Sequence, residues 1–182
     1  MHISHIKLRN WKNFKDVEAD LTLRTFVIGP NASGKSNLLD VFRFLRDVAN
    51  DGLRKAVDEE RGGVSTIRCL AATRYSNIDL EVQLVEQEQP TWTYRLSINQ
   101  DNNRRPVVRE ENVLHNGTVV KQRPDAADNR DPELLTQTAL EQISANQDFR
   151  EVATFFKSIS YQHLLPQVVR DPRGFSPLPI QD

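Results

Sequence analysis

The sequence predicts a mixed α/β fold, and three patterns along its 182 residues support that prediction. A short apolar run at residues 25–28 leads through a glycine-containing turn into apolar positions at helical spacing, as in a strand followed by an amphipathic helix. Residues 78–84 and 92–98 alternate strictly between apolar and polar side chains, which indicates antiparallel strands. Helical spacing returns in residues 133–144 and 149–159. We therefore expect an antiparallel β-meander with helices before and after it.

The first fifty residues predict two strands, a third buried strand and a helix. Residues 3–8 alternate as a half-buried strand does, residues 10–14 indicate a turn, and residues 17–23 resume the alternation. Residues 25–28 are expected to form a buried strand that runs directly into a loop. Residues 36–50 then predict an amphipathic helix. Its apolar face consists of Leu38, Leu39, Phe42, Leu45 and Val48.

The middle of the chain predicts the rest of the meander. Short strands are expected at residues 107–108 and 118–120, and Asn116-Gly117 is a hairpin signal between them. Residues 123–132 are polar and proline-flanked, so we expect a surface loop or a disordered segment there.

The last residues contain four prolines and no periodicity. We divide the chain into a lobe of residues 1–165 and a proline-rich tail of residues 166–182. The tail is expected to lead to a C-terminal half that the sequence lacks.

Composition narrows the class of protein. Hydrophobic residues make up 38% and charged residues 27% of the chain, an ordinary globular balance. The formal net charge of −1 gives no overall basic field toward nucleic acid or membranes. Cys69 is the only cysteine, so no intrachain disulfide can form. We expect Cys69 to be a small core residue and the protein to be in a reducing compartment. No apolar run approaches the ~20 residues that span a bilayer, and no signal peptide is evident, so we predict a cytoplasmic protein without a membrane partner.

Residues 29–36 predict a site for ATP and Mg²⁺. Their sequence, Gly-Pro-Asn-Ala-Ser-Gly-Lys-Ser, matches the Walker A pattern G-x-x-x-x-G-K-[ST] at every fixed position. Small residues let backbone N–H groups wrap a phosphate at the start of a helix. Lys35 is expected to reach the β- and γ-phosphates, and the Ser36 hydroxyl to bind Mg²⁺. The predicted nucleotide-binding residues of this loop are Asn31, Ala32, Ser33, Gly34, Lys35, Ser36 and Asn37.

Two segments resemble one family. Residues 29–40, which extend the loop by Asn-Leu-Leu-Asp, resemble the RecF/SMC-like branch of ABC-type ATPases, and more narrowly its stand-alone bacterial AAA family ATPases. Residues 6–14, Ile-Lys-Leu-Arg-Asn-Trp-Lys-Asn-Phe, are similar to the opening strand of those proteins. The resemblance implies a P-loop NTPase fold, namely the N-terminal lobe of an ABC/SMC-like head. It also implies ATP-driven dimerisation in the service of DNA repair or phage defence.

The resemblance adds three site residues. It implies that Arg9 and Lys12 lie beside the nucleotide, although both could equally be solvated ends of an edge strand. It implies that Gln162 is the glutamine that touches Mg²⁺ and the attacking water, against the alternative of an ordinary surface glutamine. Ala32 departs from the family because many relatives have glycine there, where the loop needs backbone freedom.

Several family parts are missing. The sequence contains no apolar strand ending in Asp-Glu to serve as Walker B, no LSGG-like signature and no switch histidine after it. We therefore assign no catalytic residues and expect that the parent protein is an ATPase and that this chain alone is inactive. The expected partner is a second copy or a complementary C-terminal half, with DNA reached through the parent protein.

Two other functions stay open. One is a P-loop kinase or a GTPase-like switch, although no Arg-bearing lid and no Asn-Lys-x-Asp base reader is evident. The other is a non-catalytic interaction module that retains the loop. Direct DNA binding has one weak indication, the basic residues Arg104, Arg105 and Arg109 near Trp92 and Tyr94, for which a solvated hairpin tip is the commoner meaning.

Overall fold

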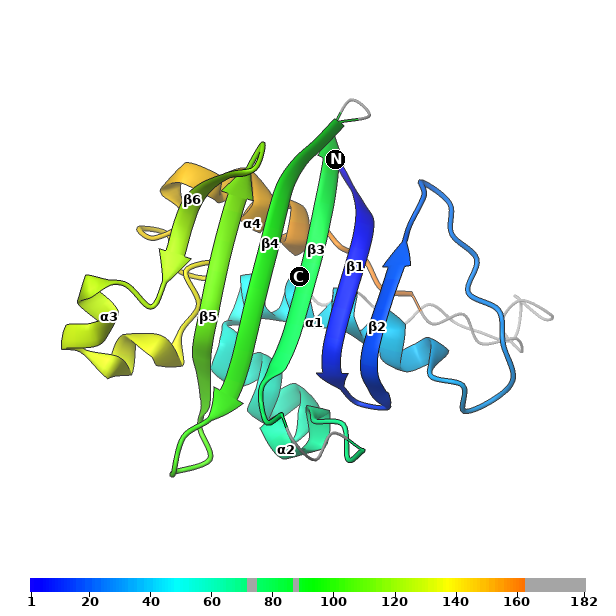
Figure 1. The fold of residues 1–182 in the computed structure, drawn as a ribbon, viewed down its shortest axis with the longest axis horizontal. Helices are drawn as coiled ribbons and strands as arrows, with labels where there is room; N and C mark the ends of the chain where they lie inside the picture. The colour runs from blue at the N-terminus through cyan, green and yellow to red at the C-terminus, as the bar shows by residue number, and fades with distance from the viewer. Residues whose placement is uncertain (72–74, 87–88, 163–182) are drawn as a thin grey trace, which may run out of the picture.

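A single antiparallel sheet forms the frame of the protein. A computed structural model describes residues 1–71, 75–86 and 89–162. Its six strands lie in the order β2-β1-β3-β4-β5-β6 (Figure 1). They are β1 (His2–Trp11), β2 (Phe14–Asp20), β3 (Ile78–Glu86), β4 (Gln89–Gln100), β5 (Pro106–His115) and β6 (Thr118–Arg123). The chain thus forms a hairpin, β1–β2, placed beside a four-stranded meander.

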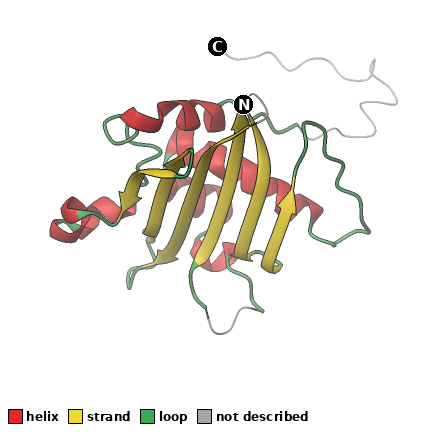
Figure 2. Cartoon of the chain, turned by 45° about the horizontal axis from the view of Figure 1, so that its top comes forward, coloured by secondary structure: helices red, strands yellow, loops and turns green. Residues whose placement is uncertain are grey.

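The helices gather on one face of this sheet. The longest, α1 (Lys35–Asp51), lies behind the central strands together with α4 (Arg150–Lys157), as Figures 1 and 2 show from two directions. The other face carries no helix among the described residues, so the fold has two layers. The shorter elements are a π-helix (Lys55–Glu59), α2 (Val64–Ile67), α3 (Ala126–Arg130) and two 3₁₀ turns (Pro132–Thr136 and Gln147–Phe149).

The core lies between the sheet and α1. Alternate residues of β1, including Ile6 and Leu8, point at the helices and are fully buried, while Lys7 and Arg9 between them are exposed. The ring of Trp11 packs against that of Phe44 in α1, with centroids 5.2 Å apart. The amphipathic pattern that predicted the helix therefore also explains which of its faces is buried.

Much of the predicted architecture is confirmed. The helix expected at residues 36–50 is α1, the helix expected at residues 149–159 is α4, and the four meander strands are present. The Asn116-Gly117 hairpin joins β5 to β6, with both residues at positive φ (48° and 78°). Cys69 is buried, as a small core residue should be.

The prediction of a buried strand at residues 25–28 was wrong. This segment has no regular structure, and Phe26 and Ile28 are 85% and 92% exposed. Pairing of β2 with β1 ends near Leu21, whose N–H donates to the carbonyl of Ser4 at 2.7 Å. An apolar run becomes a buried strand only beside neighbouring strands, and none of the described residues supplies one here.

The prediction of a surface loop or a disordered segment at residues 123–132 was right about the exposure of most of these residues but wrong about their irregular structure. This segment contains α3, which Asp125 and Asp128 cap reciprocally. Arg123 is buried and pairs with Asp128 at 2.6 Å and with Glu111 at 3.4 Å. Arg123 and Asp128, two of the polar residues that suggested a solvated loop, instead satisfy each other inside the fold.

The helix expected at residues 133–144 is reduced to the 3₁₀ turn Pro132–Thr136. Backbone N–H groups that would continue a helix are taken by a carboxylate: those of Ala139 and Leu140 donate to Glu111 at 2.6 and 3.1 Å. Glu111 is fully buried, so its carboxylate requires hydrogen-bond donors. The two N–H groups bond to it and are not available for the helix that the local pattern predicts.

A second carboxylate of this region predicts a pH effect on stability. Glu141 accepts the N–H groups of Leu53 (2.6 Å) and Thr138 (2.9 Å), which ties residues after α1 to the region before α4. Burial is the main cause that raises the pKa of Glu141 to about 7. The charge of Glu111 acts in the same direction, and the two hydrogen bonds, which lower the pKa, are outweighed. The folded chain therefore holds this proton in a range where the unfolded chain, with a pKa near 4.5, has released it.

We expect stability to fall as pH rises from about 4.5 to about 7, because the folded state binds more protons over that window. Replacing Glu141 by glutamine should flatten this fall by about 1–2 kcal/mol between pH 5 and 7.5, measured by urea unfolding. The control is Glu133→Gln, since hydrogen bonding to Arg105 lowers the pKa of Glu133. An unchanged slope for the Glu141 variant would contradict the assignment.

Candidate phosphate-binding site

The glycine-containing segment of residues 29–34 forms an exposed, turned loop that leads directly into α1. The N–H of Ser33 donates to the carbonyl of Pro30 at 3.3 Å, which closes the turn. Gly34 immediately before the helix has φ 100°, a value that glycine adopts without strain. Ala32 also lies in the left-handed region, at φ 63°, where a Cβ carries a steric cost of roughly 1 kcal/mol. Glycine would fit position 32 with less strain.

Lys35 is the first residue of α1 and its side chain folds back over the loop. Its Nζ donates to the carbonyl oxygens of Gly29 and Pro30, each at 2.7 Å. No side chain caps the start of α1, and its first turn contains no acidic residue. The amide N–H groups at this helix start therefore meet no competing carboxylate from that turn, which suits an incoming anion.

The turn between β1 and β2 is attached to this helix start. The indole N–H of Trp11 donates to the carbonyl of Asn37 at 2.9 Å, and the amide of Asn37 donates to Asn13 Oδ1 at 2.8 Å. A Cβ on Gly34 would lie 2.8 Å from Phe14 Cζ and would also clash with the Asn13 side chain. The spacing of the two sequence motifs thus corresponds to direct contact, and glycine at position 34 is required by φ and by packing.

Lys12 of the same turn reaches the site from the side. Its Nζ lies 3.0 Å from Asp40 Oδ2, one helical turn beyond Ser36. A cavity of about 210 Å³ opens here, too small for a whole nucleotide. Its lining residues are Lys12, Ser36, Asn37, Asp40, Arg43 and Tyr161. The structure therefore brings Lys12, Ser36 and Asn37 together.

Asp40 is ionised at neutral pH in this setting. Its burial opposes ionisation, but the charges and hydrogen bonds of Arg61 and Lys12 outweigh that effect and lower the pKa of the carboxyl below its ordinary value. Lys12 and Asp40 therefore form a charged pair at the edge of the cavity.

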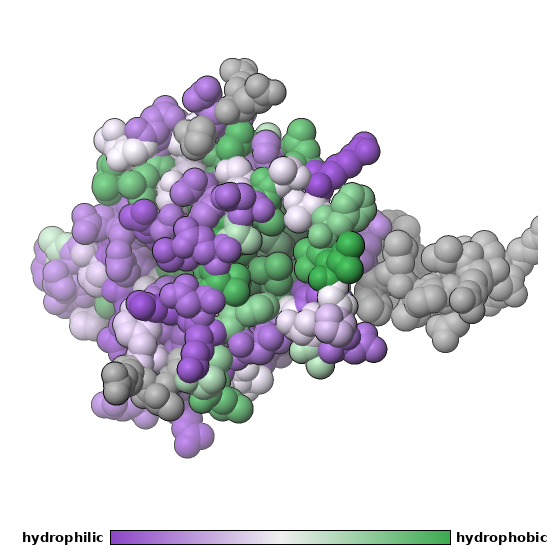
Figure 3. Space-filling model, turned by 45° about the vertical axis from the view of Figure 1, so that its right-hand side comes forward, coloured by the Kyte–Doolittle hydropathy of each residue, from purple (hydrophilic) through white to green (hydrophobic). Residues whose placement is uncertain are grey.

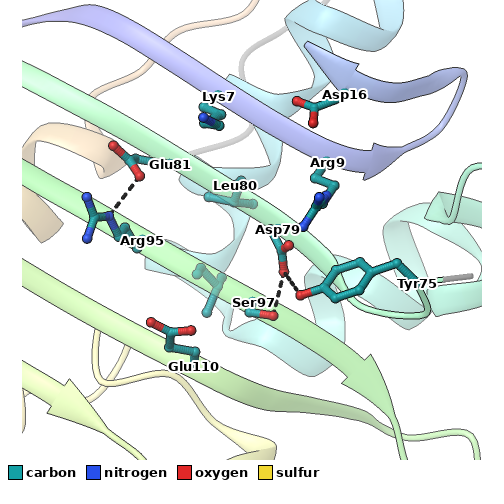
Figure 4. A pocket seen from close by; sticks show the side chains of 11 residues that line it. Lys7, Arg9, Asp16, Tyr75, Asp79, Leu80, Glu81, Arg95, Ser97 and Glu110 are labelled. Atoms are coloured by element: carbon teal, nitrogen blue, oxygen red, sulfur yellow. Dashed lines mark hydrogen bonds and ion pairs between the residues drawn. The ribbon is translucent and has the colours of Figure 1, made fainter. Parts of the chain in front are cut away.

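Arg9 lies away from the loop. It projects from the face of the sheet opposite α1 (Figure 4), with its guanidinium 4.7 Å from the centroid of the Tyr75 ring. It borders a groove of about 390 Å³ on that face, where Asp79 accepts from Ser97 at 2.6 Å. The structure does not bring Arg9 together with the loop.

Gln162 is exposed near the end of the described residues and is not among the residues that line the cavity beside Ser36. Its neighbour Tyr161 does line it. Residues 163–165 of the expected lobe and the expected tail of residues 166–182 lie outside the described residues.

The aromatic residues considered with the basic cluster for DNA binding are not on the surface beside it, and one of its three arginines is already paired. Arg105 pairs with Asp101 at 2.8 Å and with Glu133 at 2.9 Å, so its charge is neutralised locally. Trp92 and Tyr94 are buried and face the core. Arg104 is exposed, which fits the alternative interpretation that this cluster is a solvated hairpin tip.

Sequence reasoning missed the contacts that join these parts. Trp11 and Asn13 stood in an expected turn, and no pattern assigned them to the helix start. Asp40 had a usable signal: it follows Ser36 by four residues, so both lie on the same face of α1. Arg61 had no such signal, yet its side chain is 2% exposed and pairs with Asp40.

Among the described residues, no group of three or more His, Cys, Asp or Glu side chains is placed to hold a metal ion. None of the described helices is long and apolar enough to cross a membrane.

The site has the features of a P-loop protein: an exposed G-x-x-x-x-G-K-S loop precedes a helix, and the lysine folds over the loop. The comparison with known protein families is consistent with this class. Residues 24–168 match the family described as "AAA domain, putative AbiEii toxin, Type IV TA system". That match covers well over half of the chain, so the chain belongs to this AAA domain family, and the expected family branch and α/β fold class are confirmed.

A curated RecF protein is similar to part of this chain. The DNA replication and repair protein RecF of Picosynechococcus sp. (strain ATCC 27264 / PCC 7002 / PR-6) is 30% identical over 90 residues, which are 48% of this chain and 23% of that protein. The chain thus spans about a quarter of that relative's length.

Two solved structures are also similar. One is the recombination mediator protein RecF-ATPrS in the RecFOR pathway (18% identity, TM-score 0.38, 66% of this chain and 28% of that chain). The other is from work on ATP-driven dimerization and DNA stimulated activation of SMC ATPases (15% identity, TM-score 0.45, 93% and 96%).

Proposed function

We propose that residues 29–36 are a Walker A loop that binds the phosphates of MgATP. The observation that carries the proposal is the position of Lys35: it opens α1, and its ammonium is held by two neutral carbonyl oxygens of the exposed loop. Such an ammonium can turn to a phosphate without breaking a carboxylate pair. Backbone N–H groups of Asn31 to Asn37 would surround the phosphates, with Lys12 approaching from the side.

Mg²⁺ would be held mainly through Ser36 and the phosphates. Mg²⁺ keeps several waters and commonly takes one protein oxygen together with phosphate oxygens, so a preformed cluster of acidic ligands is not required. The Ser36 hydroxyl suits this role because it stands at the start of α1 and borders the cavity with Lys12. Gln162 remains a proposed second contact. When bound, the ion would neutralise phosphate charge.

The parent protein is proposed to be a RecF/SMC-like ATPase in which ATP drives dimerisation, acting in DNA repair or phage defence in the cytoplasm. Family membership and the RecF relative support this branch. Residues 1–165 would be its nucleotide-gripping lobe. Since the sequence has no Walker B carboxylates, this chain alone is proposed to bind ATP without hydrolysing it.

Titration calorimetry tests the binding. We expect saturable one-to-one binding of MgATP, at least tenfold weaker binding of MgGTP, and phosphate release no faster than the buffer blank. GTP binding as tight as ATP binding would favour the GTPase-like switch. The absence of any nucleotide binding would favour the interaction module. Steady turnover would reveal a catalytic carboxylate, with Asp40 and Glu59-Glu60 the first residues to test.

The proposed partner is the complementary C-terminal half of the parent protein. Large apolar side chains stand exposed between β2 and α1 and near the beginning of α1, and Figure 3 shows hydrophobic side chains on that side of the molecule. We call this the uncovered apolar surface; it consists of Leu23, Phe26, Val27, Ile28 and Leu39. A cluster of this kind marks an interaction site. DNA would be contacted through the assembled parent protein.

A further inference from the structure

The Lys12 side chain belongs to a partly buried ion network that the proposed phosphate site does not explain. Its backbone is fixed on two sides. The Lys12 N–H donates to the carbonyl of Ile67 in α2 at 2.5 Å, and the adjacent Trp11 is bound to Asn37 of α1. Lys12 itself has φ 50°, a left-handed value that such contacts must hold in place. The stem of the lysine therefore starts from a defined point.

Asp40 holds the other end of that side chain. Its Oδ2 lies 3.0 Å from Lys12 Nζ, and the Lys12 side chain is 25% exposed, so the ammonium stands at the mouth of the cavity that Ser36 borders. A four-carbon side chain without this partner would sample many rotamers. The carboxylate therefore keeps the ammonium beside the helix start.

Arg61 supports Asp40 from the opposite side. Its guanidinium donates to both Asp40 oxygens, at 3.1 and 3.2 Å, in the forked geometry that suits a carboxylate. It also pairs with Asp47 at 3.0 Å and donates to the carbonyl of Ala56 at 2.7 Å. Asp40 consequently keeps a buried cationic partner if Lys12 turns to another anion. Release of Lys12 leaves no unpaired buried charge.

We propose that Asp40 is a positioning residue of the nucleotide site: with Arg61 behind it, its carboxylate holds the Lys12 ammonium ready to contact the nucleotide phosphates. This inference rests on the proposed binding of MgATP. Asp40 itself touches no ligand. The segment that carries Arg61, between the π-helix and α2, thereby becomes part of the support of the site.

The test measures the affinity of the 182-residue chain for MgATP, by competition with a fluorescent ATP analogue, in four variants. Lys12→Gln should weaken binding about tenfold, and Asp40→Asn about fivefold because the lysine loses its anchor. The double variant should bind no more weakly than Lys12→Gln alone, because both substitutions remove the same contribution to affinity, the contact of the Lys12 ammonium with the nucleotide. Asp40→Glu keeps the charge and should recover part of the loss.

Asp47→Asn is the matched control. Asp47 is buried and shares Arg61 with Asp40 but does not contact Lys12, so this variant should lower the melting temperature at least as much and change affinity less than twofold. Additive losses in the double variant, equal losses for Asp47→Asn, or tighter binding by Asp40→Asn would overturn the proposal. If the unmodified chain binds no MgATP, the proposed function itself fails, which is a separate outcome.

Discussion

Replacing Lys35 by alanine is expected to weaken MgATP binding at least about 100-fold while leaving the chain folded. Its ammonium carries the one full positive charge that the loop itself supplies. A charge-assisted contact to phosphate of about 3 kcal/mol corresponds to that factor. The loss should be visible by calorimetry as a titration without a measurable transition.

The fold should tolerate this change. In the described structure Lys35 Nζ contacts two carbonyl oxygens of a solvent-exposed loop, and alanine suits a helix start. The melting temperature should therefore shift little. Lys15→Ala is the matched control, because Lys15 is an exposed lysine on β2 and its loss should leave affinity unchanged. A Lys35 variant that binds MgATP within threefold of the original chain would contradict the phosphate-loop assignment.

The parts of the fold that could be predicted are those determined by patterns within one continuous segment of the sequence. The meander strands alternate over several residues, and α1 has a clear apolar face, so local pattern and tertiary burial agree. The loop was predictable for a related reason: its fixed positions serve one backbone shape, and Gly34 has the positive φ that this shape needs.

The parts that could not be predicted depend on contacts between distant residues. Residues 133–144 have helical periodicity, but Glu111 lies on β5 and takes the N–H groups that a helix would use. Arg61 pairs with Asp40 across 21 positions of the sequence. A charged residue looks the same in sequence whether it is solvated or buried in a network, so such pairs appear only when the fold is known.

The uncovered apolar surface predicts that the isolated chain associates with itself. Leu23, Phe26 and Ile28 are 80%, 85% and 92% exposed, and they lie close together in the sequence. Each such side chain contributes roughly 1.5–3 kcal/mol when it moves from water into a contact. We therefore expect light scattering to show dimers or larger species at high concentration, through an interface above ~1,000 Å².

The replacement of Phe26 and Ile28 by serine should weaken that association about 100-fold or more, since it removes two of these side chains. The fold should survive, because both residues already face solvent. Ile143→Ser is the control: Ile143 is 75% exposed but lies between the 3₁₀ turns, away from this surface, so its loss should leave association unchanged. A clean monomer of the unmodified chain at high concentration would refute the prediction.

If association persists in the serine variant, another surface carries it, and the complementary half would then have no reason to bind at residues 23–28. Co-expression with a longer form of the parent protein separates the two partners, because a true complementary half should displace the second copy and shield Phe26 from solvent.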